Sequence, residues 1–221
     1  MIRDLFKRIN SFIALPVIAL IFSIIAYAHN EYKDYKKSKI EELNKKLELF
    51  YYPLQAQFIS SENEWNAFRR KYGNNRDAYF SSGPVDIDGK THFLRDCAKG
   101  EAWKLAIGEG STYNESSTKK YCIVSDIEIE AWVNHISAQY HGSEGRAEQI
   151  ILENRKLISE DKEMIEYVDK LMLHFTGYRD VIARWEKGDR RIMTSHNNFP
   201  KGITKLVDER IKSIEHEIKN N

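Results

Sequence analysis

The sequence predicts a mainly α protein, in which an N-terminal transmembrane helix is followed by an antiparallel helical bundle with an irregular insertion. Residues 11–28 contain no charged side chain, although 30% of the chain is charged. Beyond them, apolar residues recur at spacings of three and four, as they do on one face of an α-helix. Between residues 73 and 124 this periodicity is lost, and Gly, Asn, Ser and Asp cluster there instead.

These patterns divide the chain into five parts. The predicted parts are an N-terminal tail over residues 1–10, a transmembrane anchor over 11–28, an amphipathic helical region over 29–72, a loop-rich insertion over 73–124 and a helical bundle over 125–221. The residues after the anchor are enough for one ordinary domain with its own core. We expect no second domain.

Residues 11–28 are interpreted as an uncleaved anchor. At about 1.5 Å per residue they would reach roughly 27 Å, close to the ~30 Å hydrocarbon core of a bilayer. A secretory signal peptide is the alternative, because Arg3, Lys7 and Arg8 precede the apolar stretch and residues 26–28 fit an Ala-x-Ala cleavage site. A buried core helix would normally show a polar stripe. The larger number of basic residues after the stretch favours a single-pass protein of the bacterial inner membrane with a cytoplasmic C-terminal domain.

Two small residues lie four positions apart on this predicted anchor. Ala19 and Ser23 would lie on one face of the helix, where small side chains allow a second helix to approach closely. We therefore predict a helix–helix contact at Ala19 and Ser23, and self-association of the chain. The lipid bilayer is the other expected partner.

The region over residues 29–72 is predicted to be helical with one interruption. Pro53 disfavours helical geometry at Tyr52, so a kink or break is expected there. A new helix is expected to start near Ser61, which has the spacing of a capping box with Glu64. The apolar residues that line the first helix are Ile40, Leu43, Leu47, Phe50 and Leu54.

The C-terminal part is predicted to contain four further helices. The first begins at Ser125, which again forms a capping box with Glu128, and Gly142 and Gly145 should interrupt it. The last begins after Pro200. The longest apolar seam of the whole sequence consists of Met164, Val168, Leu171, Phe175, Tyr178, Ile182 and Trp185.

Charge and cysteine content support neither nucleic-acid binding nor a zinc site. With 34 basic and 33 acidic residues the net charge is +1, which gives no electrostatic support for direct nucleic-acid binding. Cys97 and Cys122 are the only cysteines. They would pair in an oxidising compartment and stay reduced in the cytoplasm, and without a CxxC pair they do not indicate a zinc site.

Candidate chemistry in the sequence is weak. Residues 86–89 resemble a fragment of a calcium loop but lack its further acidic ligands, which favours a simple turn. A Cys97 nucleophile with His92 or His135 as its base is conceivable, as it is in any chain with two cysteines and seven histidines. We therefore expect no catalytic, cofactor-binding or metal-binding residue, no cofactor and no enzymatic activity.

A polar contact is predicted inside the long seam. His174 lies between apolar residues there and is expected to hydrogen-bond a neighbouring helix in a polar layer, for instance at Asn154. The insertion over residues 73–124 is the first candidate for a partner site, because long loops in compact domains often carry function.

Three stretches of the chain, residues 48–54, 150–158 and 171–178, resemble small single-span bacterial proteins of phage-defence operons. Overall the chain is most similar to transmembrane effectors of retrons, in which a reverse transcriptase and its RNA–DNA product restrain the effector. The resemblance implies a non-enzymatic antiviral toxin or effector that assembles and impairs the inner membrane when triggered, with the reverse transcriptase as a partner. It covers the anchor and the helical parts, and it implies no catalytic residue.

Two other functions are left open by the sequence. The chain fits a membrane-tethered sensor or scaffold that binds a protein partner without harming the membrane. An anchored enzyme would need polar side chains of the insertion, such as Asp86, Asp88, His92 and Cys97, to gather against the helices.

Overall fold

The structure is a computed structural model that describes residues 2–72, 85–87, 89–96 and 121–220, with the side chains of residues 2–19, 21, 87, 96 and 121 left outside the description. The described part is mainly helical, as predicted. Its longer helices are α1 (Ile2–Lys46), α2 (Tyr52–Tyr72), α3 (Asp126–Gln139), α4 (Gly145–Asn154), α5 (Lys162–Glu186) and α6 (Ile203–Asn220). Shorter helical turns connect some of them, namely η1 (Leu47–Tyr51), η2 (Tyr140–Glu144) and η3 (Arg155–Ile158).

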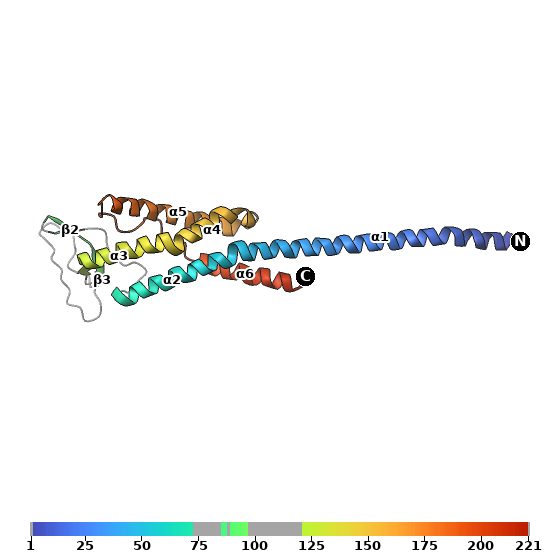
Figure 1. Cartoon of the computed structure of the whole chain (residues 1–221), viewed down its shortest axis with the longest axis horizontal. Coiled ribbons are helices and arrows are strands. Elements are labelled where there is room, and N and C mark those ends of the chain that lie inside the picture. The colour runs from blue at the N-terminus through green and yellow to red at the C-terminus, as the bar shows by residue number, and fades with distance from the viewer. Residues whose placement is uncertain (1, 73–84, 88, 97–120, 221) are drawn as a thin grey trace, which may run out of the picture.

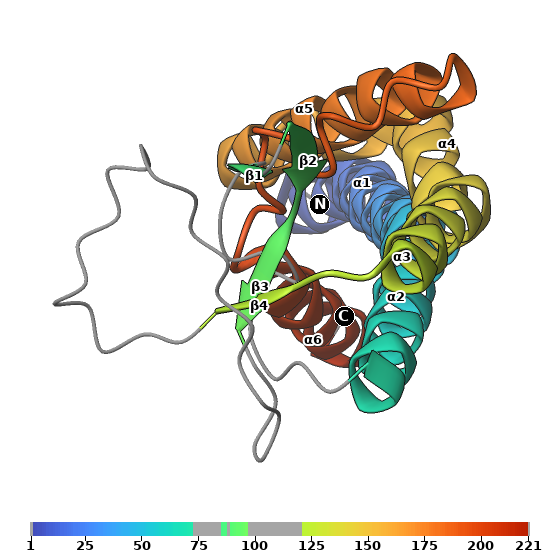
Figure 2. The same cartoon turned by 90° about the vertical axis from the view of Figure 1, so that its left-hand side faces the viewer.

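Four short strands belong to the predicted insertion. Strand β1 (Val85–Ile87) pairs antiparallel with β2 (Lys90–His92), and β3 (Leu94–Asp96) pairs antiparallel with β4 (Tyr121–Ile123). Gly89 supplies the positive φ of +74° in the turn between β1 and β2. Figure 2 shows these strands together at one end of the helices.

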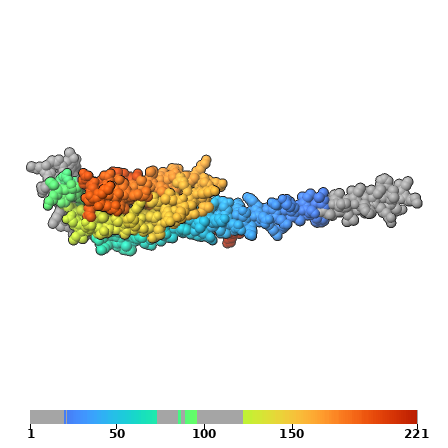
Figure 3. Space-filling model, turned by 45° about the horizontal axis from the view of Figure 1, so that its top comes forward, coloured from blue at the N-terminus to red at the C-terminus, as the bar shows by residue number. Residues whose placement is uncertain are grey.

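Most of α1 projects from the rest of the molecule. Figure 1 shows α1 continuing well past the other helices, with the N-terminus at its far tip, while α2, α3, α4 and α5 pack side by side at the other end. The space-filling view in Figure 3 gives the same outline of a compact body with one long extension. The root of α1 contacts α6, where Lys39 Nζ lies 2.6 Å from Glu217 Oε1.

The predicted transmembrane anchor was wrong. Among the described residues, no helix is both long and apolar enough to cross a bilayer. The described side chains of α1 begin at Leu20, and after Ala28 the uncharged stretch gives way to a run rich in charged residues within the same helix. The predicted single-pass location in the inner membrane, with a cytoplasmic C-terminal domain, was wrong for the same reason.

Two apolar clusters hold the body together, and α5 takes part in both. Its first half, with Met164, Val168, Leu171 and Phe175, packs against buried residues of α1, η1, α2, α4 and α6. Its second half, with Val181, Ile182 and Trp185, packs with aromatic residues of α2 and α3. The predicted seam is therefore buried along its length, apart from the partly buried Tyr178.

Side-chain caps fix where two helices begin. The predicted capping box is confirmed, since the Glu128 amide donates to Ser125 Oγ at 3.3 Å and the Ser125 amide donates to Glu128 Oε2 at 2.9 Å. Helix α5 begins at a cap that the sequence analysis missed, where Asp161 accepts from the Met164 amide at 3.0 Å. Arg210 of α6 donates to the same carboxylate at 2.5 Å, and this contact lowers the pKa of Asp161.

The predicted interruptions had mixed outcomes. Gly142 has non-helical angles, with φ of −93° and ψ of −109°, so the interruption expected there is confirmed. The prediction that a new helix starts near Ser61 was wrong, because α2 continues without a break through this position. The non-helical geometry expected at Tyr52 was wrong, because Tyr52 has helical angles, with φ of −64° and ψ of −46°. Pro53 lies in the first turn of α2, where the amide hydrogen it lacks is of little consequence.

Candidate functional site

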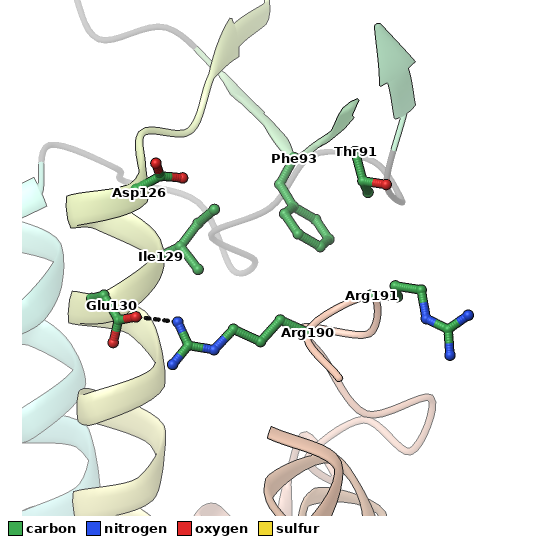
Figure 4. A pocket seen from close by; sticks show the side chains of 7 residues that line it. All are labelled: Thr91, Phe93, Asp126, Ile129, Glu130, Arg190 and Arg191. Atoms are coloured by element: carbon green, nitrogen blue, oxygen red, sulfur yellow. Dashed lines mark hydrogen bonds and ion pairs between the residues drawn. The ribbon is translucent and has the colours of Figure 1, made fainter. Parts of the chain in front are cut away.

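A pocket of about 320 Å³ lies at the end of the body that carries the strands. Thr91 and Phe93 line it from the predicted insertion, Asp126, Ile129 and Glu130 from α3, and Arg190 and Arg191 from the segment after α5. Figure 4 shows Phe93 and Ile129 facing the same space as the extended side chain of Arg190. The pocket therefore combines an apolar wall with charged groups of both signs.

Most of the charged side chains in the pocket are already paired. Arg190 forms an ion pair with Glu130. Arg191 binds the carboxylate of Asp189 through two nitrogens, each 2.9 Å from an oxygen, and these hydrogen bonds hold the pKa of Asp189 well below its usual value. The carboxylate of Asp126 accepts no hydrogen bond from a described residue. Within the described ranges, Asp126 is thus the charged residue of the pocket that has no ion-pair partner.

Contacts between α3, the strands and the 189–193 segment fix the walls of the pocket. Arg95 of β3 is buried and its Nε lies 2.8 Å from Glu128 Oε1 of α3. The indole nitrogen of Trp132 donates to the Met193 carbonyl at 2.8 Å, and that of Trp185 donates to the Ile192 carbonyl at 2.8 Å. The lining residues are therefore held by hydrogen bonds that lie behind the pocket surface.

A second polar site lies inside the body, where η2 interrupts the path from α3 to α4. Ser143 is fully buried and donates from Oγ to Glu64 Oε2 at 3.2 Å. His174 is also buried, donates from Nδ1 to the Asn197 carbonyl at 2.7 Å, and has Nε2 3.9 Å from Glu144 Oε1. These hydrogen bonds link η2 to α2 and α5 to the segment before α6. Because the buried polar atoms are satisfied in this way, a structural role is favoured over a catalytic one.

The contact predicted for His174 differs in detail. Its partners lie in η2 and in the segment before α6, whereas Asn154 donates to the Ile150 carbonyl of its own helix at 3.1 Å. Tyr178, one turn further along α5, has its pKa raised to about 12, chiefly because burial disfavours the phenolate. A hydrogen-bonded His174 was thus predicted correctly, but Asn154 as its partner was wrong.

The histidines and cysteines proposed for catalysis are not brought together among the described residues. His135 lies on α3 against the rings of Phe68 and Trp65, with ring centroids 4.5 Å and 5.6 Å away, and its buried Nε2 has no hydrogen-bond partner there. Cys122 is disulfide-bonded, and Cys97 lies outside the described residues. The suggested cysteine–histidine pair therefore gains no support.

The motif at residues 86–89 forms a turn in the part that is described. Thr91 Oγ1 donates to Asp86 Oδ1 at 3.0 Å across β1 and β2, while Asp88 lies outside the described residues. Within the described ranges, no group of three or more His, Cys, Asp or Glu side chains is arranged to hold a metal ion.

A third feature is the apolar surface on the projecting part of α1. Ser23 lies in this part of the helix and is exposed, and the side chain of Ala19 lies outside the description, so the helix contact predicted at these two positions stays a prediction. Several large apolar side chains around them are more than half exposed. They are Leu20, Phe22, Ile24, Ile25, Tyr27, Tyr32 and Tyr35.

Comparison of the chain with models of protein families, with curated proteins and with solved structures finds no match. The resemblance to retron effectors and the absence of enzymatic activity therefore stay predictions from the sequence. A role in antiviral defence, in a retron system or as a toxin or effector has no support in these comparisons. The predicted transmembrane helix is wrong, because no described helix is long and apolar enough to cross a bilayer.

The pocket residues are the ones that sequence reasoning missed. Arg190 and Glu130 are 60 positions apart, and neither belongs to a recognised motif. The one local signal is the Asp189-Arg190-Arg191 run directly after the positive φ of Gly188 that ends α5, because a charged run after a helix terminus marks an exposed loop.

Proposed function

We propose that this protein is a non-enzymatic interaction protein that assembles with further copies of itself through the projecting segment, defined as residues 20–35 of α1. In this proposal the remaining helices form an antiparallel bundle that serves as a rigid body. The observation that carries the proposal is the exposure of large apolar side chains on the part of α1 that projects beyond the packed helices.

Apolar side chains surround the first part of the projecting segment, from Leu20 to Tyr27, before its charged run begins. At about 100° per residue, Leu20, Ile24 and Tyr27 lie on one side of the helix, and Phe22 and Ile25 lie on the other. Phe22 is 67% exposed and Ile25 is 58% exposed. A helix that is apolar on all sides needs neighbours on more than one side, so a pair of helices would leave apolar surface in water. This favours an assembly of three or more copies.

A second copy of the chain is the partner that best fits this surface. The segment presents the same apolar faces in every copy, and symmetric homo-oligomers are the commonest protein assemblies. The net charge of +1 means that copies do not repel one another at long range. Contacts at the end of α1 and the start of η1, where Leu43 and Leu47 are buried against the body, fix the direction in which the segment projects.

The molar mass of the full chain in solution tests the proposal. Analytical ultracentrifugation of the purified full chain should give an oligomer whose population rises with protein concentration. The double variant Phe22→Glu, Ile25→Glu should be monomeric with an unchanged melting temperature, because its charges lie outside the packed body. Leu173→Glu is the matched control, since Leu173 is also an exposed large apolar residue but lies on α5.

Two results would contradict the proposal. One is a wild-type chain that remains monomeric at every concentration, including a monomer that instead co-sediments with lipid vesicles. The other is a double variant that keeps the wild-type mass while Leu173→Glu loses it, which would place the interface on the body.

A further inference from the structure

We propose that the pocket between β2, α3 and the 189–193 segment binds a primary ammonium group carried on an apolar stem, such as an alkylamine or a lysine side chain. This inference concerns the opposite end of the molecule from the projecting segment and does not depend on the proposed self-association.

The charge of the pocket selects a cation. Arg190 is neutralised by Glu130, and Arg191 is neutralised by Asp189, so neither guanidinium is available to an anion without breaking an ion pair. Asp126 has no such partner among the described residues and lines the same space. An ammonium group placed there would form a charge-assisted hydrogen bond with this carboxylate.

The start of α3 does not compete as an anion site. A helix N-terminus attracts anions through its unpaired amides. In α3 the side chain of Ser125 accepts from the Glu128 amide, and the side chain of Glu128 accepts from the Ser125 amide. The capping box thus already pairs some of the amide groups at the start of α3. It also places the Glu128 carboxylate beside them, where its negative charge would repel a bound anion.

The apolar wall selects the rest of the ligand. Phe93 and Ile129 face the space beside Asp126, as Figure 4 shows, and the face of an aromatic ring attracts a cation at short range. The volume of about 320 Å³ is at the small end of the range for ligand pockets. A short alkyl chain fits these requirements, and its methylene groups would cover the Phe93 and Ile129 side chains while the ammonium group reaches Asp126.

A titration of the full chain with three probes of equal length tests this inference. Butylammonium, 1-butanol and butyrate differ at the polar end, and NMR of the isotope-labelled full chain can follow the Ile129 methyl resonances. Butylammonium should shift them saturably and bind at least about fivefold more tightly than butanol or butyrate, which corresponds to roughly 1 kcal/mol. Equal or tighter binding of butyrate, or no saturable shift with butylammonium, would overturn the assignment.

A pair of charge-removing variants locates the effect. Asp126→Asn should weaken butylammonium binding at least about fivefold and abolish the preference over butanol, because an amide retains the shape but not the charge. Asp169→Asn removes the same charge from an exposed position on α5, outside the pocket, and should leave binding unchanged. Asp126→Glu should retain the preference for the cation. Wild-type affinity in Asp126→Asn would overturn the role of this carboxylate, and the near-UV spectrum of each variant reports whether the fold is intact.

Discussion

Helix α5 and the projecting segment of α1 are both rich in apolar residues, but they use them differently. In α5 the large side chains repeat along one stripe, and Met164, Val168 and Leu171 are completely buried. In the projecting segment they occur on all sides and stay exposed. A single apolar face can be buried against the protein's own core. A projecting helix with apolar residues on several faces needs neighbours from outside the chain to bury them. The arrangement of apolar residues, more than their number, therefore distinguishes a helix that packs in the core from one that we propose packs against other copies.

The largest expected effect is loss of a buried side chain in α5. Leu171→Ala should lower the free energy of unfolding by about 2–5 kcal/mol, because it removes apolar contacts and leaves a cavity. Urea unfolding monitored by circular dichroism measures the change. Leu173→Ala is the matched control two positions along the same helix, where the side chain is exposed, and it should have almost no effect. Equal losses in the two variants would contradict the burial pattern of α5.

A smaller loss of stability is expected where the segment before α6 contacts α5 at Gly177. A Cβ at Gly177 would lie 2.1 Å from Ser195 Oγ and 3.2 Å from Ser195 Cβ, so Gly177→Ala must displace the Ser195 side chain, which accepts a hydrogen bond from the Asn197 amide. Overpacking of this kind costs about 1–3 kcal/mol, partly offset by the better helix propensity of Ala. Thermal unfolding should show the loss, and the same substitution in a Ser195→Gly background should cost less. An unchanged cost in that background would exclude the clash as its cause.

Acid should weaken the packing between α2 and α3. Burial lowers the pKa of His135 in the folded chain, although Glu64 and Glu144 act in the opposite direction. The unfolded chain has the ordinary histidine pKa of about 6.5, so it takes up a proton more readily than the folded chain as the pH falls below that value. Stability should therefore be fully present above this pH and decrease below it.

The variant His135→Phe separates this effect from the other titrating groups. Its ring keeps the contacts with Trp65 and Phe68 but does not titrate. The free energy of unfolding, measured with urea at pH 7 and pH 5, should decrease less in the variant than in the wild type. A steeper decrease in the variant would mean that His135 is charged in the folded state.

The smallest effect is expected on the projecting segment. Phe22→Ser, measured at a concentration where the copies are separate, should change the free energy of unfolding by less than about 0.5 kcal/mol, because this side chain touches little of its own body. At high concentration the same change should lower the melting temperature, because binding between folded copies adds to stability. A loss as large as that of Leu171→Ala at low concentration would show that Phe22 is packed within its own chain.

The sequence predicted those parts of the fold that depend on local patterns. The α5 seam and the capping box at Ser125 follow from spacing over a few turns, and both are present. Pro53 was harder to interpret, because the same residue breaks the middle of a helix and is tolerated in its first turn. The spacing of Ser61 and Glu64 likewise occurs inside α2, where Ser61 accepts a hydrogen bond from Gln139 of α3 instead of capping a helix.

The N-terminal prediction failed for a related reason. The lack of charge over residues 11–28 suggested a membrane span, but none of the described helices is both long and apolar enough to cross a bilayer. The pocket could not be predicted either, because Phe93, Asp126 and Arg190 come from three distant segments and meet only when the strands and α3 are placed against the end of α5. Such a site depends on tertiary packing that no local spacing encodes.

The absence of a loop between α1, η1 and α2 has a consequence for the geometry of any assembly. Lys46 and Tyr52 both have helical angles on either side of η1, so helical structure joins the projecting part of α1 to the body without a loop. Inserting a single residue into this shaft would rotate the tip by about 100° relative to the body. The number of residues in α1 thus sets the angle at which the bodies of neighbouring copies face each other. Any insertion or deletion in α1 changes this angle and the distance between tip and body together.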